Sequence, residues 1–243
     1  MPSTSETGHA KNVTHFEQLI SFCTGYGGNY NPSKATLTIP NLTALHTTAQ
    51  SELQNVINAT VDYNNLVNTR AITFEPIRKL STRLINAFSV TDATSEMIKD
   101  AKTINRKIQG KRAKEITEPT DPNTPAPNTI SASQQSYDQL IEHFAKLFTL
   151  LKSEPSYNPN ETELNIPTLD SLIAQYRSDN TNVMNAYTTV SNARIARDVT
   201  LYQDNTGLVP IALDVKGYIK SVFGATSDQY KQVSKIAFKI IKK

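Results

Sequence analysis

The stretch YNPSKATLTIPNLTAL at residues 30–45 returns as YNPNETELNIPTLDSL at residues 157–172, and this recurrence decides the expected fold. The offset is 127 residues and needs no gap. Carried over residues 30–74, it gives 16 identities in 45 positions, where ordinary residue frequencies give roughly three. A match of that strength is typical of an internal repeat. We therefore predict a tandem duplication.

The likeness continues on both sides of this stretch once gaps are allowed. FEQLISF from Phe16 resembles YDQLIEHF from Tyr137. ATSEMIKDAKTINRKI from Ala93 resembles ATSDQYKQVSKIAFKI from Ala225. We expect the first helical repeat at 12–114 and the second at 134–243.

Two stretches fall outside the repeats. Residues 115–133 hold four closely spaced prolines, which forbid a helix and predict a proline-rich linker. Residues 1–11 are polar, and we expect them to form a disordered tail.

Proline, glycine and capping residues mark the helices expected in each copy. In the first copy we expect helices at about 12–25, 40–72 and 75–88, and a fourth from Thr91 or Asp92 to about Gly110. The second copy repeats this plan, with a loop of about eight extra residues after Arg197. The long helix carries an apolar stripe at heptad-like spacing, formed by Leu42, Leu45, Ala49, Val56, Ala59, Tyr63 and Leu66.

The predicted fold is therefore all-α. It consists of two roughly four-helix units, each with one long helix, which we expect to be helical bundles related by a pseudo-twofold axis. A last helix is expected in the ending YKQVSKIAFKIIKK, whose apolar residues fall on one face and whose lysines fall on the other.

The composition points to a cytoplasmic protein without disulfides. The net charge is only +3, whereas a dedicated nucleic-acid binder concentrates far more positive charge. The single Cys23 suits a reducing compartment. The first residues lack the apolar run of a secretory signal, and no apolar stretch reaches the length of a membrane span.

Polar residues shared by the two copies are the first candidate site. At 100° per residue they fall on the side of the long helix opposite its apolar stripe. They form either a recognition face, a contact between the repeats, or a solvated surface, and we favour the solvated surface. The shared residues are Ser51, Asn55, Asn58, Asn65, Ser178, Asn182, Asn185 and Asn192.

Two sets of cations are further candidates. Arg70 and Arg197 end the two long helices, where they can bind an anion, or can bond to helix carbonyls or to a carboxylate of their own repeat. We favour a bond within the repeat. A basic patch for a membrane surface or a nucleic acid is formed by Lys107, Lys111, Arg112, Lys231, Lys235, Lys239, Lys242 and Lys243.

Motifs for catalysis, metals and cofactors are not found. The glycines at 25–28 lack the strand and the Lys-Ser/Thr of a phosphate loop. The four histidines lie outside any metal-binding spacing, and Cys23 is too far from His15 along the helix to form a catalytic pair. We therefore expect no catalytic residue, no metal and no cofactor.

These observations rank three functions. The first is a non-enzymatic interaction or scaffold protein with a protein partner, which includes a second copy of the chain. The alternative is a peripheral membrane-surface or nucleic-acid-binding protein that uses the basic helix ends. The third is a small-ligand binder with a polar pocket between helices.

Overall fold

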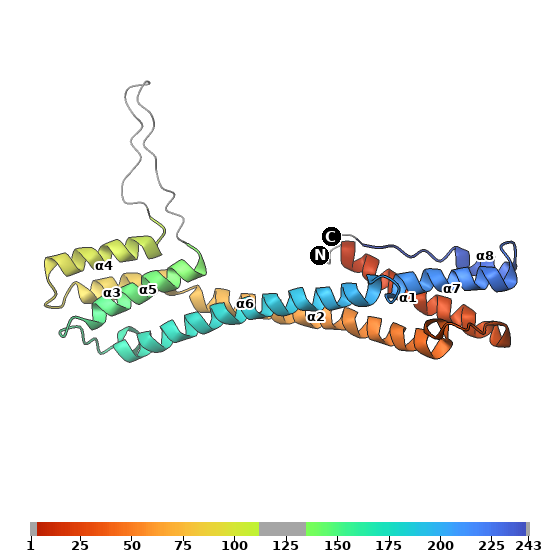
Figure 1. Cartoon of the computed structure of the whole chain (residues 1–243). Coiled ribbons are helices and arrows are strands. Elements are labelled where there is room, and N and C mark those ends of the chain that lie inside the picture. The colour runs from red at the N-terminus through yellow and green to blue at the C-terminus, as the bar shows by residue number, and fades with distance from the viewer. Residues whose placement is uncertain (1–3, 112–134, 242–243) are drawn as a thin grey trace, which may run out of the picture. The chain divides into compact units, whose positions relative to one another are not determined.

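The computed structural model of the chain describes residues 4–111 and 135–241. Over these residues the secondary structure comprises eight α-helices and three short 3-10 helices, with no strand (Figure 1). The all-α prediction is confirmed. The linker expected at 115–133 lies outside the described residues.

The two segments that we predict to be copies contain four α-helices each, and we keep the name copy for these segments. The first copy forms α1 (Thr4–Gly25), α2 (Ile39–Phe74), α3 (Ile77–Phe88) and α4 (Ser95–Ile108). The second forms α5 (Tyr137–Lys152), α6 (Ile166–Tyr202), α7 (Leu208–Phe223) and α8 (Asp228–Ser234). The 3-10 helices are η1 (Gly27–Asn29), η2 (Ala35–Leu37) and η3 (Thr162–Leu164).

The same corner precedes both long helices. The Tyr30 hydroxyl donates to the Leu37 carbonyl at 2.7 Å, and the Tyr157 hydroxyl donates to the Leu164 carbonyl at 2.8 Å. Both tyrosines are buried. Each hydrogen bond joins residues seven positions apart, so the tyrosine fixes the turn that precedes its long helix.

The start of the chain differs from its expected disorder. Helix α1 begins at Thr4, inside the stretch 1–11. The reason is that His9 and Asn12 are buried and bonded: the His9 ring lies 2.6 Å from the Tyr202 hydroxyl, and Asn12 donates to the same oxygen. His9, which lies in the stretch predicted to be a tail, therefore has a partner far along the chain.

Two helix ends also differ from expectation. Helix α4 is capped by Thr94 rather than by Thr91 or Asp92, because the Thr94 hydroxyl accepts from the Met97 N–H. The expected terminal helix stops at Ser234, and residues 235–241 are not helical. Side chains of α1 and α7 form hydrogen bonds with the backbone of residues 235–241, and these bonds take the place of helical ones.

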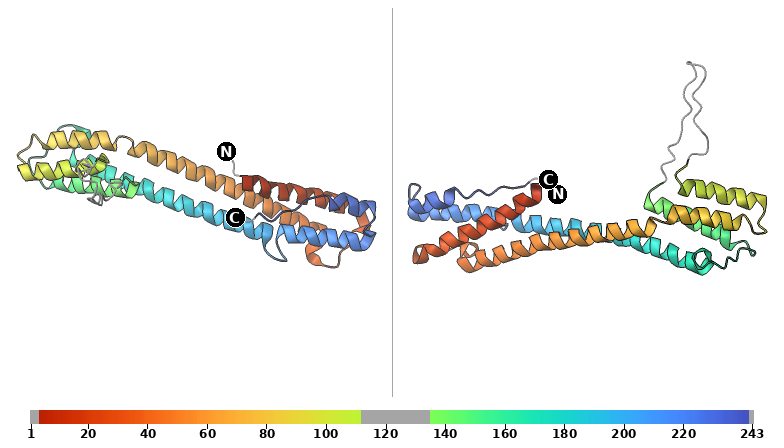
Figure 2. Two further views of the ribbon diagram at one scale, coloured as in Figure 1. Left: turned by 90° about the horizontal axis from the view of Figure 1, so that it is seen from above. Right: turned by 180° about the vertical axis from the view of Figure 1, so that it is seen from behind.

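The chain divides into two compact units whose limits fall inside both long helices. Unit 1 takes residues 1–63 and 186–243, and unit 2 takes residues 64–185. We expected each copy to form its own bundle, but each unit draws on both copies. Helices α2 and α6 are 36 and 37 residues long (Figure 2), and each contributes to both units. Helices of 12–16 residues cover only part of that length, so the two halves of a long helix pack in different cores.

Each unit has its own apolar core. In unit 1, side chains of α1 and the first half of α2 pack with the end of α6, α7 and α8; they include Phe16, Leu19, Leu42, Leu201, Leu208, Val215, Ile219 and Val233. In unit 2, the end of α2, α3 and α4 pack with α5 and the first half of α6; the core includes Phe74, Leu84, Phe88, Ile108, Phe144, Leu147, Leu169 and Tyr176.

Candidate functional site

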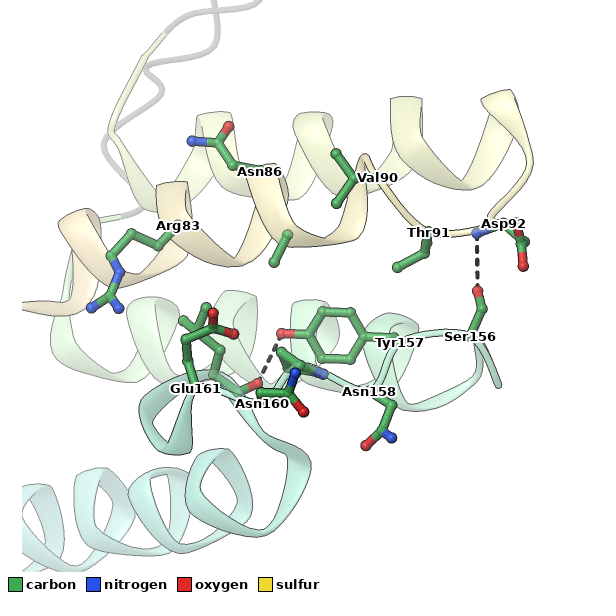
Figure 3. A pocket seen from close by; sticks show the side chains of 13 residues that line it. Arg83, Asn86, Val90, Thr91, Asp92, Ser156, Tyr157, Asn158, Asn160 and Glu161 are labelled. Atoms are coloured by element: carbon green, nitrogen blue, oxygen red, sulfur yellow. Dashed lines mark hydrogen bonds between the residues drawn. The ribbon is translucent and has the colours of Figure 1, made fainter.

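A surface pocket of about 640 Å³ lies in unit 2 beside the second tyrosine corner (Figure 3). One wall is the last turn of α3 with the turn that follows it. The other wall is the segment between α5 and η3. The residues that line the pocket are Arg83, Asn86, Ala87, Val90, Thr91, Asp92, Ser156, Tyr157, Asn158, Pro159, Asn160, Glu161 and Leu164.

Local hydrogen bonds hold the two walls together. The Asp92 N–H donates to the Ser156 hydroxyl at 3.0 Å (Figure 3), and that hydroxyl donates in turn to Glu154 at 2.6 Å. The Tyr157 ring lies 6.0 Å from the Phe88 ring, centroid to centroid. The pocket is therefore anchored to the core of unit 2 through a buried aromatic pair.

The polar groups of the pocket suit hydrogen bonding rather than proton transfer. Its amides and carboxylates are exposed, and Arg83 pairs with Glu163 at the rim. Burial, with a smaller effect from Glu161, raises the pKa of Tyr157 to about 12. That hydroxyl thus stays protonated at neutral pH and is already bonded to the Leu164 carbonyl. The pocket offers donors and acceptors to a polar molecule.

Unit 1 fills the equivalent place with an aromatic side chain. Helices α3 and α7 both end in phenylalanine, and counting back five residues from each places Tyr218 where unit 2 has Arg83. The Tyr218 ring packs edge-on against Tyr30 at 5.3 Å, and its hydroxyl accepts from the Asn31 N–H at 3.2 Å. Tyr218 therefore packs against the tyrosine corner of unit 1 at the position where unit 2 has Arg83.

A second feature, in unit 1, is a row of exposed apolar side chains on α6. Tyr187, Ile195 and Val199 are 62%, 54% and 50% exposed, and we call them the apolar strip. They fall in one row with a spacing of four residues, with Ser191 between the first two. A shallow groove of about 380 Å³ joins Ile195 and Val199 to Tyr202. The strip is thus an apolar surface along one side of α6.

The shared polar residues of the long helices are all exposed. Asn58 accepts from Gln54 at 2.8 Å, and Asn55 donates to Glu52 at 3.4 Å, so both bond to neighbours on their own helix. None of the eight lines the pocket or the groove described above. The residues that the sequence offered for a polar pocket between helices are therefore found in neither cavity.

The two arginines that we considered for anion binding each contact residues of their own unit. Arg70 donates to the Asn180 side chain at 2.7 Å, and its guanidinium carbon lies 3.9 Å from the centroid of the Tyr137 ring. Arg197 is buried and donates twice to Asp198, at 2.9 and 2.7 Å. Both guanidinium groups are thus engaged inside the fold.

The residues of the expected basic patch fall in different units. Lys107 and Lys111 are exposed in unit 2. In unit 1, Lys231 pairs with Asp228 at 3.0 Å, and Lys235 and Lys239 are exposed. Arg112, Lys242 and Lys243 lie outside the described residues.

Cys23 is buried in the core of unit 1. Burial raises the pKa of its thiol to about 12, so the thiolate needed for nucleophilic attack is scarce at neutral pH. Over residues 4–111 and 135–241, no three His, Cys, Asp or Glu side chains gather to hold a metal ion.

Sequence reasoning missed both the pocket and the apolar strip. The pocket residues Asn160 and Glu161 stand where the first copy has Ser33 and Lys34, so a signal lay in the differences between copies. The strip also differs between the copies, since Tyr187 and Ile195 stand where the first copy has Thr60 and Asn68. That signal is weak, because isolated apolar residues are common on protein surfaces.

Comparisons with known proteins give no match: no family model, curated protein or solved structure resembles this chain. In the part of the chain that the structure describes, no helix has both the length and the hydropathy required to cross a bilayer. Function therefore has to be argued from the residues themselves.

Proposed function

We propose that this chain is a non-enzymatic interaction protein whose apolar strip docks an amphipathic helix of a protein partner. The exposure of Tyr187, Ile195 and Val199 in one row on α6 carries the proposal. A row of residues spaced by four is the ridge that packs into the groove of another helix. Amphipathic helices are recognised in this way through side chains on one face.

The distribution of exposed apolar side chains also supports a docking site on a long helix. Seven of the eleven large apolar side chains that are exposed in the described residues lie on α2 and α6: Ile57, Val61, Ile72, Met184, Tyr187, Ile195 and Val199. These helices hold 73 of the 215 described residues, so exposed apolar side chains are concentrated on them. Concentrated apolar exposure is typical of interaction surfaces.

The test compares two double variants of unit 1. Ile195→Gln with Val199→Gln removes two of the three side chains of the strip, and Leu213→Gln with Val222→Gln removes two exposed apolar side chains of α7 as a matched control. Because all four positions are exposed, both variants should melt within a few degrees of the wild type.

We expect a tenfold or larger loss of the partner captured by the strip variant from the native cell, and no loss for the control. Light scattering on the purified chain shows whether the partner is a second copy. Equal capture by the two variants, with both chains folded, would contradict the proposal.

A second candidate function is favoured by the pocket of unit 2. We propose that it takes a small, neutral, hydroxyl-bearing molecule, because its amides and carboxylates supply both donors and acceptors. Arg83→Tyr copies the side chain that fills the equivalent place in unit 1. A compound that raises the melting temperature of the wild type but not of this variant supports the site. If no saccharide or polyol in a panel does so, the candidate fails.

We also infer that the chain arose by duplication of a helical unit and works in the cytoplasm. The two tyrosine corners and the matching sets of helices in the two units support duplication, and the buried thiol of Cys23 suits a reducing compartment. Because each unit needs halves of two copies, residues 4–111 expressed alone should form a homodimer. A folded monomer in light scattering would contradict this inference.

A further inference from the structure

We propose that the face formed by α1 and α7 in unit 1 is a binding site for an extended peptide, and that residues 235–241 are its built-in, displaceable occupant. This site is separate from the apolar strip. The segment leaves α8 and runs back along α7 to the start of α1 (Figure 1). It is held mainly by side chains of α1 and α7 that form hydrogen bonds with its backbone.

Asn12 of α1 makes the central contact. This side chain is only 2% exposed. Its amide donates to the Lys239 carbonyl at 2.7 Å, and its carbonyl accepts from the Lys239 N–H at 3.1 Å. One amide thus satisfies both backbone groups of a single residue, as a neighbouring β-strand does for an extended chain.

Two further side chains bond the backbone of the same segment. The His15 Nδ1 lies 2.6 Å from the Ala237 carbonyl, and because a carbonyl can only accept, this nitrogen donates. Lys216 of α7 donates to the Ile236 carbonyl and, at 3.4 Å, to the Ser234 carbonyl. Contacts of this kind accept any side chain on the peptide, so they give affinity without fixing its sequence.

Specificity comes from two apolar positions. Ile236 is buried in the core of unit 1. The Phe238 ring stands edge-on to the His15 ring at 6.2 Å, and the Lys216 ammonium lies 5.3 Å from its centroid. Lys235, Ala237 and Lys239 between them are exposed. The site therefore suits an extended segment of another protein that carries apolar and aromatic residues two positions apart.

The occupant has the properties of a bound peptide rather than of a core element. It has no helix or strand, and only Ile236 among its residues is buried. A tethered occupant competes at a high effective concentration, often millimolar for a short linker. Removing it should therefore expose the site to a peptide added in solution.

The test uses the labelled peptide SKIAFKIIKK, residues 234–243, in fluorescence anisotropy. A chain shortened after Ser234 should bind the peptide saturably, and the full chain should bind it at least tenfold more weakly. Asn12→Leu in the shortened chain should weaken binding tenfold or more. A control peptide with Ile236→Ser and Phe238→Ser keeps every lysine and should not bind.

Equal binding of both peptides would show a charge effect only and overturn the proposal, as would no binding to a folded shortened chain. A full-length dimer that is lost on shortening would assign the site to a second copy instead. If the shortened chain does not fold, amide hydrogen exchange of the full chain decides. Residues 235–241 should open before α1 and α7, and exchange only together with them would overturn the proposal.

Discussion

Cutting the chain between the two copies is the sharpest test of its architecture. We would introduce a protease site within residues 115–133 and cleave the folded protein there. If each copy were a bundle of its own, the fragments would separate. Because each compact unit contains helices from both copies, we expect the fragments to stay together.

The number of apolar side chains buried in the shared cores determines how strongly the two fragments should associate. The second copy buries eight large apolar side chains in unit 1: Leu201, Leu208, Val209, Ile211, Val215, Ile219, Val233 and Ile236. At about 1.5–3 kcal/mol each, their burial contributes at most roughly 12–24 kcal/mol, part of it within the same copy. Association costs about 4–15 kcal/mol. Unit 2 adds a second core shared in the same way, so the fragments should remain bound at micromolar concentration.

The assay is native size-exclusion chromatography with light scattering on the cleaved protein. We expect one species with the mass of the intact chain, which separates into two fragments only in denaturant. Two folded species that elute apart without denaturant would refute the division into units. An uncleaved sample of the same variant controls for effects of the inserted site.

Three further predictions concern single residues. Gly207→Ala should destabilise the fold by about 1–3 kcal/mol, because a Cβ there would lie 2.6 Å from the Gln203 backbone nitrogen; an unchanged urea midpoint would contradict this. Burial, with two nearby lysines, lowers the pKa of His143, so the unfolded chain takes up the proton first and stability should fall as the pH drops below about 6.5. His143→Gln should reduce the difference in melting temperature between pH 7.5 and pH 5, and an undiminished difference would count against it. Cys23 should react with a thiol reagent only after unfolding, and a fast native reaction at pH 8 would show that it is accessible.

The helices, and those of their boundaries that are marked by proline or glycine, were predictable because local residues determine them. The expected helix at 40–72 is Ile39–Phe74, and the one at 75–88 is Ile77–Phe88. The expected loop after the second long helix lies between Tyr202 and Leu208. Proline and glycine act over one or two turns of chain, so their effect is visible in one sequence.

The division into units was not predictable, because a periodic stripe shows which face of a helix is buried but not which helix covers it. Leu42, Ala49 and Val56 belong to the predicted stripe of α2 and are buried in unit 1. Phe74, at the end of the same helix, is buried in unit 2 against Tyr176 of the other copy. The partner of each half is decided by helix lengths and by contacts that are distant in sequence.

Identity between the copies also proved a poor guide to the candidate sites. The shared Asn and Ser residues of the long helices are exposed, and Asn55 and Asn58 bond to neighbours on their own helix. The pocket combines shared corner residues, such as Tyr157 and Asn158, with positions at which the copies differ, since unit 1 has Tyr218 where unit 2 has Arg83. The strip follows the same rule at Tyr187 and Ile195, which stand where the first copy has Thr60 and Asn68. The shared tyrosine corners build the scaffold, whereas the shared Asn and Ser residues lie on its surface. The surfaces that we propose for binding depend on residues found in one copy only.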